Sequence, residues 1–309
     1  MNETKDTFQP GRFLAPRHWP MWLGLGLLRL SALLPFPLLL ALGGGLGRLM
    51  YALVPKRRHI ARTNIRLCFP ELDEETHERM VRATFHSAAI SVFENALAWW
   101  GSDRRIRTLY RIEGLEHFNA AQQQGKGIIL LGGHYTTLEI SGRFLAYHIP
   151  ALQPIYKRAH NPLYEALMSS MRRRRFDDLL LNTDMRTIVR NVKAGKTVWY
   201  APDQDFGRER SVFAPFMGVH TATLTTTARL AKLTGAPVLP YYSERLPGLL
   251  GYRVQLLPAL DGFPSGDDLA DATRINAVLE QQVRAVPEQY LWIHRRFKTR
   301  PEGEPDLYR

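Results

Sequence analysis

GIILLGGHYTTLEI, residues 127–140, decides the fold because it joins two structural patterns. Four consecutive apolar residues, Ile128 to Leu131, are flanked by glycines and predict a buried strand. His134 follows this strand, and Glu139 stands five residues later, where the pattern becomes helical. The pair is therefore either a catalytic base with its orienting carboxylate or the polar junction between a strand and a helix.

The same alternation continues along the chain on both sides of this stretch. Apolar runs predict strands at 127–132, 154–156, 178–181, 197–201, 237–242 and 252–257. Helical periodicity predicts helices at 71–100, 136–148, 161–175, 184–194, 223–234 and 270–286. This pattern predicts an α/β fold with a mostly parallel central sheet flanked by helices. A short connection at 243–251 predicts an antiparallel pair at the end of the sheet.

The position of His134 favours a function, since sheets of this kind bind ligands at the carboxyl ends of their strands. Residues five apart on a helix are rotated by roughly 140°. His134 and Glu139 can therefore meet only if His134 lies in the loop and Glu139 in the first helical turn. Thr136 with Glu139 also matches a capping box, in which the glutamate binds only the helix backbone. The local sequence alone does not distinguish the two interpretations.

As a catalytic pair, His134 would accept a proton near neutral pH while the carboxylate fixes its tautomer. No serine or cysteine occupies a nucleophile-elbow pattern, so the prediction is direct transfer to a substrate hydroxyl without a covalent acyl-enzyme. The adjacent helix N-terminus offers backbone N–H groups to a developing oxyanion. One histidine with one glutamate is too few ligands for a metal. Neither a metal nor a cofactor is predicted.

Composition points to anionic partners. The 309 residues carry a net charge of +12, with a pI near 10.0 and 45% hydrophobic residues. Nucleic acid, an anionic leaflet, phosphorylated lipids or an acidic carrier protein would all fit this charge. The run Arg172 to Arg175 would point in every direction on a helix, so part of it is expected to be solvated surface. The single cysteine, Cys68, fits a reducing compartment.

The N-terminal region is unusually apolar. Residues 21–51 contain only two charged side chains, Arg29 and Arg48, and are long enough to span a bilayer. The basic stretch PKRRHIARTNIR follows immediately and would lie at anionic cytoplasmic headgroups. These features predict a membrane anchor at 1–55 and an α/β domain at 56–309 on the cytoplasmic side. The alternative is a helical hairpin packed on the core.

The segment GGHYTTLEISGR resembles the H-x4-D/E motif of the glycerolipid acyltransferase superfamily. It looks most like the late acyltransferases of lipid A biosynthesis, of the Kdo2-lipid IVA lauroyltransferase type. The resemblance covers nearly the whole chain, and its separated motifs occur in the family's order. They are NIRLCFPEL, HNPLYEAL, VWYAPDQDFG, SVFAPFMGV, TATLTTTARLA and PEQYLWIHRRFKTRPEG.

The resemblance implies that His134 is the general base and that Glu139 supports it. The implied donor is an acyl carrier protein thioester, and the implied acceptor is the 3-hydroxyl of a hydroxyacyl chain on Kdo2-lipid IVA. The context of the glutamate favours a lauroyl or palmitoleoyl chain over a myristoyl chain, and we expect the C12 lauroyl chain. The implied location is the inner membrane.

The resemblance extends to IYKRAHNPLYE, but with departures. Lys157 stands where the family has an arginine, and Arg158 where it has a proline. Either cation would face a phosphate or the oxyanion, although lysine cannot form a bidentate clamp. We expect both residues, together with Asn161, to bind substrate. A basic strand end with an Asn-Pro turn is the alternative.

Two further motifs supply expected substrate contacts. In APDQDFG, Asp203 and Asp205 would point into the cleft, to a sugar hydroxyl or to position Arg208; an ordinary polar loop is the alternative. In HRRFKTR, Arg295 and Arg296 would meet the phosphates of the lipid or the acidic carrier protein.

The rival hypotheses are an acyltransferase for another glycolipid or glycerolipid and a non-catalytic basic protein that binds membrane or nucleic acid. No zinc finger, helix-turn-helix or RNP signal accompanies the basic residues. We therefore expect no nucleic-acid partner.

Overall fold

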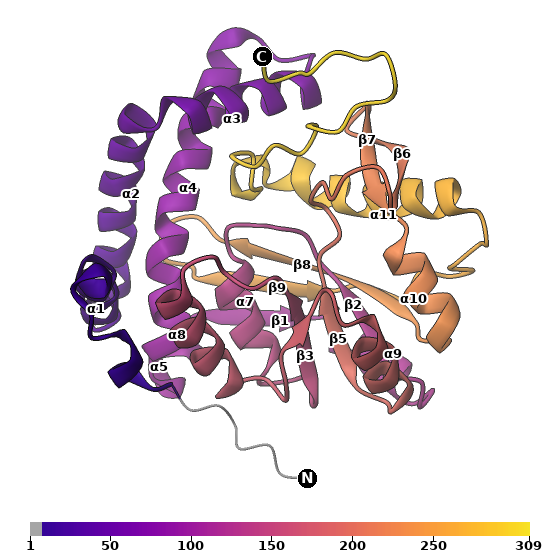
Figure 1. Ribbon diagram of the computed structural model, residues 1–309, viewed down its shortest axis with the longest axis horizontal. Helices are drawn as coiled ribbons and strands as arrows, with labels where there is room; N and C mark the ends of the chain where they lie inside the picture. Colours follow the sequence, from indigo (N-terminus) through magenta and orange to yellow (C-terminus); the bar gives the residue numbers. More distant parts are fainter. Residues whose placement is uncertain (1–7) are drawn as a thin grey trace.

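The computed structural model describes residues 8–309. Its centre is a seven-stranded sheet with the order β1-β9-β8-β2-β5-β3-β4, flanked by helices (Figure 1). All neighbouring strands are parallel except the antiparallel pair β8–β9. The predicted fold class is confirmed. The strands of this sheet are β1 (Tyr110–Glu113), β2 (Ile128–Leu131), β3 (Leu152–Tyr156), β4 (Leu180–Leu181), β5 (Thr197–Tyr200), β8 (Val238–Arg245) and β9 (Tyr252–Leu256).

The sequence prediction missed two features of the strands. β1 pairs with β9 and lies outside it, so the antiparallel pair does not end the sheet as expected. β1 has only four residues and none is fully buried, so it lacks a clear apolar pattern. A separate hairpin, β6 (Ser211–Phe216) and β7 (Val219–Leu224), was also not predicted. Because β7 includes residues 223–224, the helix expected from 223 begins at Thr226.

Helices cover both faces of the sheet. β2 is buried at every position, as expected for a strand covered on both sides. Ile128 and Leu130 pack in one apolar core, and Ile129 and Leu131 pack in the other. The helices are α1 (Trp19–Ser31), α2 (Phe36–Leu53), α3 (Pro55–Cys68), α4 (Glu74–Trp100), α5 (Asp103–Arg107), α6 (Leu115–Gln122), α7 (Leu138–Leu145), α8 (Pro162–Arg173), α9 (Met185–Lys193), α10 (Thr226–Thr234) and α11 (Asp268–Ala285), with short 3-10 turns η1 (Pro10–Phe13), η2 (Pro16–His18) and η3 (Pro287–Gln289).

α4 is the long helix that connects the N-terminal region to the sheet (Figure 1). Its Glu94 forms a buried ion pair with Arg245 of β8, and the two groups lie 2.6 Å apart. Ser87 of α4 forms a hydrogen bond of 2.8 Å with Thr136, in the loop after β2. α4 is thereby joined both to the sheet and to the segment that carries His134.

The predicted apolar segment forms two helices, α1 and α2, which break at residues 32–35. α2 packs along α4, and its Leu39, Gly43 and Gly47 are buried there. Residues 36–53 are also long and apolar enough to cross a membrane by length and composition. One face of α2 packs on α4, but most of the helix is not buried, so it is not the buried hairpin of the alternative interpretation. The membrane anchor stays a prediction. Residues 1–7 of the predicted anchor lie outside the described residues.

Candidate active site

His134 and Asp203 form the central contact of the candidate active site. β2 and β5 are parallel neighbours, and their last paired residues are Leu131 and Tyr200. His134 and Asp203 each follow that pair at the same carboxyl edge of the sheet. The ring Nδ1 of His134 lies 2.6 Å from Asp203 Oδ1, and its backbone N–H donates to Oδ2 at 2.9 Å. The register of two strands thus brings these residues together.

The environment keeps Asp203 ionised. Its side chain is 1% exposed, whereas that of His134 is 25% exposed. Burial opposes ionisation, but the charge and hydrogen bonds of His134 hold the pKa of the Asp203 carboxyl well below its ordinary value. An ionised carboxylate can only accept hydrogen bonds, so Nδ1 carries a hydrogen and Nε2 is the basic nitrogen. This tautomer is the one that a general base at Nε2 requires.

Glu139 does not provide the carboxylate for His134. It lies in the first turn of α7 as expected, but Trp99 Nε1 donates to its Oε1 at 2.7 Å and Arg172 Nη2 donates to its Oε2 at 2.5 Å. These partners come from α4 and α8, so the carboxylate is directed toward those helices. The structure brings His134 together with Asp203 rather than with Glu139.

The expected capping box is also not formed. α7 begins at Leu138, and the side chain of its N-cap, Thr137, makes no capping hydrogen bond. Thr137 instead bonds Ser243, and Thr136 bonds Ser87. The helix therefore begins one residue later than it would if Thr136 were the N-cap. Glu139 forms an ion pair with Arg172 and does not bond the helix backbone as a capping box would require.

The Glu139–Arg172 pair lies next to the cavity described below. The two side chains are 13% and 16% exposed. Burial disfavours both charges, but Arg172 lowers the pKa of Glu139 and Glu139 raises the pKa of Arg172. The Arg172 guanidinium also lies 5.8 Å from the ring centre of Tyr156. Part of the run Arg172 to Arg175 was expected to be solvated surface. Arg172 itself is nearly buried and lines the cavity.

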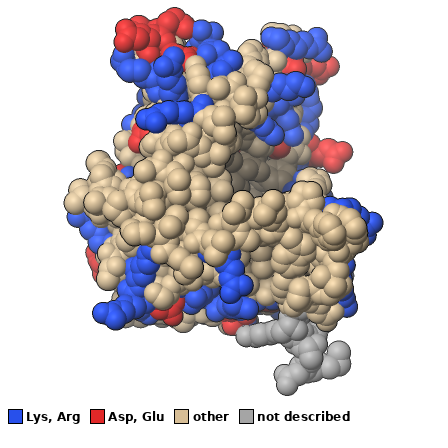
Figure 2. Space-filling model, turned by 90° about the vertical axis from the view of Figure 1, so that its left-hand side faces the viewer, with Lys and Arg blue, Asp and Glu red and all other residues tan. Residues whose placement is uncertain are grey.

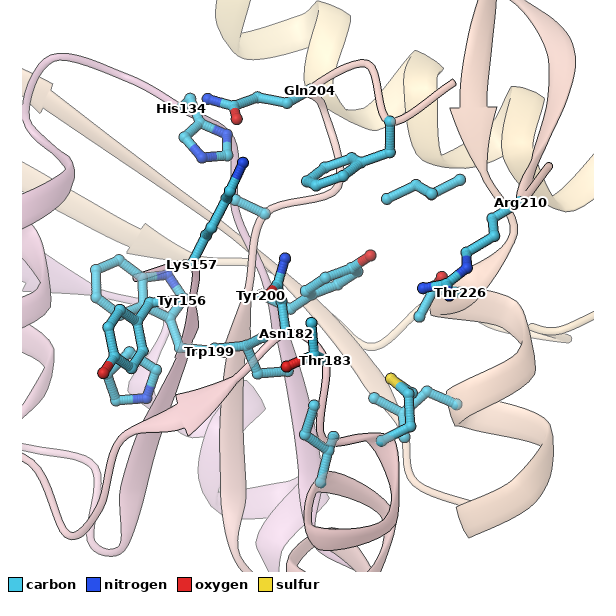
Figure 3. Close-up of a pocket in the computed structure, with 18 of the residues that line it drawn as sticks. His134, Tyr156, Lys157, Asn182, Thr183, Trp199, Tyr200, Gln204, Arg210 and Thr226 are labelled. Carbon is cyan, nitrogen blue, oxygen red and sulfur yellow. The ribbon is translucent and has the colours of Figure 1, made fainter. Parts of the chain in front are cut away.

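A cavity of about 820 Å³ opens beside His134, below the carboxyl edge of β2, β3 and β5 (Figure 3). Polar side chains lie around it, including Lys157, Gln204, Arg210 and Thr226. Aliphatic and methionine side chains of α8, α9 and α10 line much of the remainder. They are Met168, Met185, Ile188, Val189, Leu230 and Leu233.

The structure separates the two predicted cations. Lys157 lines the cavity, and Figure 3 shows it on the same side of the cavity as His134. Arg158 is exposed and is not part of the cavity wall. Alternation along an extended chain places neighbouring side chains on opposite sides. Lys157 is thus the cation that can reach a group bound beside His134.

Asn161 and Asp205, two of the other predicted substrate-binding residues, form hydrogen bonds within the protein. Asn161 caps α8, since its Oδ1 accepts from the backbone of Leu163 and Tyr164. Asp205 is buried and accepts from both the backbone N–H and the hydroxyl of Thr299 at 2.8 Å. Asp205 thus holds the C-terminal segment against the loop after β5, and does not position Arg208.

The paired arginines of HRRFKTR also differ from each other. Arg295 is on the surface and lies 3.3 Å from Asp306. Arg296 is 2% exposed, donates to the carbonyl of Ala222 at 3.2 Å and lies against the ring of Phe216. Arg296 therefore joins the C-terminal segment to the hairpin β6–β7, and it stabilises the charge of nearby Asp203.

His294 is a site residue that the sequence reasoning did not single out. It lines a small second cavity together with His134, Asp203 and Gln204. Burial, with a further contribution from His134, lowers the pKa of His294 to about 4. A neutral imidazole therefore stands beside the His134–Asp203 pair at physiological pH. Its position in the C-terminal motif, directly before the two arginines, was the available signal.

Comparisons with known proteins show the family of this chain. Residues 7–299 match the family described as bacterial lipid A biosynthesis acyltransferase. The chain is 39% identical over 297 residues to the lipid A biosynthesis palmitoleoyltransferase of Escherichia coli K12, covering 96% of each chain. It is also 39% identical over 296 residues to the lauroyltransferase of the same organism, again covering 96% of each chain. Identity to its myristoyltransferase is 30% over 305 residues, covering 96% of this chain and 92% of the relative.

These matches cover the body of the chain, including β2, β5 and the loops after them that carry His134 and Asp203. The chain belongs to the bacterial lipid A biosynthesis acyltransferases, and the protein is an acyltransferase.

Proposed function

We propose that the protein transfers a lauroyl chain from an acyl carrier protein thioester to the 3-hydroxyl of a hydroxyacyl chain on Kdo2-lipid IVA. The observation that carries this proposal is the His134–Asp203 pair at the mouth of the cavity. It provides a base beside a space suited to an acyl chain. The family supplies the acceptor class, and the sequence resemblance supplies the donor.

In the proposed reaction, Nε2 of His134 removes the proton from the acceptor hydroxyl. The alkoxide oxygen attacks the thioester carbonyl and forms a tetrahedral intermediate. The carbon–sulfur bond then breaks, and the carrier thiolate takes the proton from His134 and leaves as a thiol. Asp203 holds Nδ1–H and stabilises the imidazolium between these steps. No side chain becomes acylated.

Lys157 is the proposed cation for the negative charge that develops on the carbonyl oxygen or for a phosphate of the acceptor. It is the basic residue of the predicted pair that lines the cavity. A cation aimed at developing charge stabilises a transition state more than the ground state. Glu139 supports the site indirectly, because it orients Arg172 in the cavity wall.

The apolar part of the cavity is the proposed acyl-chain site. Burying each CH₂ of a chain is worth about 0.8 kcal/mol, so chain length is read by how many carbons the walls enclose. The chain is equally similar to a lauroyl- and a palmitoleoyltransferase. A palmitoleoyl donor is therefore the second candidate, and the assay must contain both.

We further propose that the enzyme acts at the inner membrane with its α/β domain on the cytoplasmic side, attached through residues 1–55. The apolar helices α1 and α2 and the basic start of α3 support this assignment. Acyl carrier protein is cytoplasmic and acidic, so both it and an anionic acceptor would complement the net charge of +12.

The test is an acyl-transfer assay with purified protein in detergent. Kdo2-lipid IVA is mixed with acyl carrier protein thioesters of graded length, including lauroyl and palmitoleoyl. We expect one preferred length, and a loss on the order of 10²–10⁴ in rate for His134→Ala. The matched control is His160→Ala, because His160 is exposed and outside the cavity. Full activity in a folded His134→Ala protein would refute the mechanism. Transfer only to another lipid would replace the acceptor.

A further inference from the structure

We propose that α1 and α2 lie flat within the acyl-chain layer of one leaflet of an anionic bilayer, and that neither helix crosses it. This inference deepens the proposed membrane attachment and rests on it. It does not depend on which acyl chain or acceptor the enzyme uses. Its basis is the way the two helices are fixed to the catalytic body.

α2 is held against α4 along its length. A Cβ atom at Gly43 would lie 2.5 Å from Ile90 Cγ1, and one at Gly47 would lie 2.7 Å from the Cα of His86. The helices therefore touch through backbone at two successive turns of α2. Such contact leaves no space for lipid between α2 and α4.

Both ends of α2 are attached as well. At its start, the Phe36 ring lies 5.9 Å from that of Tyr252 in β9. At its end, the hydroxyl of Tyr51 donates to Glu78 of α4. If α2 crossed a bilayer, α4 would be drawn into the hydrocarbon beside it. Beside the middle of α2, α4 carries His86 next to Gly44, and one turn after Ile90 it carries the Glu94 that pairs with Arg245; polar and charged groups at that depth are costly.

α1 is too short to cross. Its 13 residues extend about 20 Å, whereas the hydrocarbon core is about 30 Å thick. The turn that follows α1 is fixed, since Arg105 of α5 donates to the carbonyls of Ala32 and Leu34. In Figure 1, α1 is seen nearly end-on while α2 runs vertically, at the same side of the molecule. The two helices therefore lie at a steep angle to each other on the same side of the molecule.

That face is apolar where it meets solvent. Leu33 is 79% exposed and Leu53 is 68% exposed, so the face gains no cover from the protein. Figure 2 views this side and shows a broad area without charged side chains, with Lys and Arg above and below it and a smaller number of Asp and Glu among them. The exposed apolar residues are Leu14, Trp19, Leu23, Leu27, Leu30, Leu33, Leu38, Leu42, Leu49 and Leu53. We call these residues the leaflet face.

The charges around the leaflet face select an anionic lipid surface as its partner. Residues 8–70 contain no Asp or Glu, but they contain several Lys and Arg. Arg17 stands before α1 and Lys56 after α2, and both are exposed. Each basic side chain near an anionic surface contributes about 1 kcal/mol of attraction. An apolar face on a segment whose charged residues, over 8–70, are all cations is complementary to acyl chains below acidic headgroups.

The first experiment measures which side of the membrane each flank occupies. Single cysteines replace the exposed Gln9, His59 and Lys193, and Cys68 is buried and serves as the unlabelled background. Inverted and right-side-out vesicles of the bacterial inner membrane are treated with an impermeant maleimide. All three positions should be labelled from the same face. Labelling of Gln9 and His59 from opposite faces would show that the chain crosses, and would overturn the proposal.

The second experiment measures depth, because a hairpin that crosses twice would pass the first. A fluorophore is attached to cysteines at Leu38, Leu42, Leu49 or Leu53 in vesicles of phosphatidylcholine and phosphatidylglycerol. Lipids brominated at different carbons then report depth by quenching. Four similar depths within one leaflet support the proposal. Depths that pass through the bilayer centre along α2 overturn it.

The control position is Leu269, which is 50% exposed on α11, away from α1 and α2 in Figure 1. It should be unquenched by any lipid. Absence of quenching at all four α2 positions, with crosslinking between copies, would assign the leaflet face to a dimer and overturn the proposal. Neither readout involves acyl transfer. An inactive enzyme with in-plane helices would therefore refute only the proposed reaction.

Discussion

Asp203 accepts two hydrogen bonds from His134, one from the ring Nδ1 at 2.6 Å and one from the backbone N–H at 2.9 Å. The carboxylate therefore fixes both the position and the tautomer of the histidine. Glu139, the acidic member of the H-x4-E motif, instead binds Arg172. The motif accordingly supplies the proposed base and, through Arg172, a contact with the cavity wall, while the carboxylate that bonds the histidine follows the neighbouring strand β5.

The first prediction concerns this division of roles. Asp203→Asn should lower kcat on the order of 10³-fold, because an amide no longer stabilises the imidazolium or enforces its tautomer. Glu139→Gln should have a smaller effect on kcat. Steady-state kinetics with the lauroyl donor measure both. A larger loss in Glu139→Gln than in Asp203→Asn would return the orienting role to Glu139.

The second prediction is a pH-dependent stability difference. Glu139→Gln leaves Arg172 unpaired in a nearly buried position and should destabilise the protein by roughly 3 kcal/mol at pH 7. The pKa of Glu139 is lower in the folded state than in the unfolded state. The ionised carboxylate therefore stabilises the folded protein above the ordinary glutamate pKa of about 4.3, and this stabilisation is lost as the pH falls through the folded-state pKa. The difference between wild type and variant should therefore shrink below about pH 4. Urea unfolding in detergent across this range measures it, and a pH-independent difference would contradict the ion-pair explanation.

The third prediction tests the contact between α2 and α4. Gly43→Ala should destabilise the protein by about 1–3 kcal/mol, because the new methyl group would meet both the side chain and the Cα of Ile90. Gly45→Ala is the matched control, since nothing lies within 4 Å of its added Cβ. That variant should be neutral or stabilised by up to about 1 kcal/mol. Equal effects in denaturation experiments would mean that α2 does not pack as described.

The fourth prediction separates the two neighbouring cations. Lys157→Ala should lower kcat/KM by about 10²-fold, because it removes the positive charge on the His134 side of the cavity. Arg158→Ala should change kcat/KM by less than about 3-fold, since Arg158 is exposed and outside the cavity. Lys157→Arg is expected to retain part of the activity. The reverse ranking would assign the family's arginine role to Arg158.

The fifth prediction concerns chain length. Val189→Phe places a larger side chain in the apolar wall contributed by α9 and should shift the preferred donor to a shorter chain. Competition between donors of graded length measures the ratio of kcat/KM values, which should change by about 10-fold or more for the longest donors. Val278→Phe is the control, as Val278 is also partly buried but lies outside the cavity. An unchanged preference in Val189→Phe would place the acyl chain elsewhere.

Local patterns in the sequence determined the alternation of strands and helices, the buried strand before His134 and the position of Glu139 in the first turn of a helix. Each depends on residues close together in the chain, and the separated motifs also identified the family. The short β1 and the hairpin β6–β7 carried too weak a local signal, since β1 and β6 are only partly buried and β6 contains a proline.

The partner of His134 was decided by tertiary structure alone. His134 and Asp203 are 69 residues apart and meet because β2 and β5 are parallel neighbours that end in register at Leu131 and Tyr200. Glu139 meets Arg172 for a similar reason, since Arg172 belongs to α8 and is 33 residues further along the chain. Spacing in a motif restricts which residues can meet locally. The pairing order of the strands decides which distant carboxylate reaches the base.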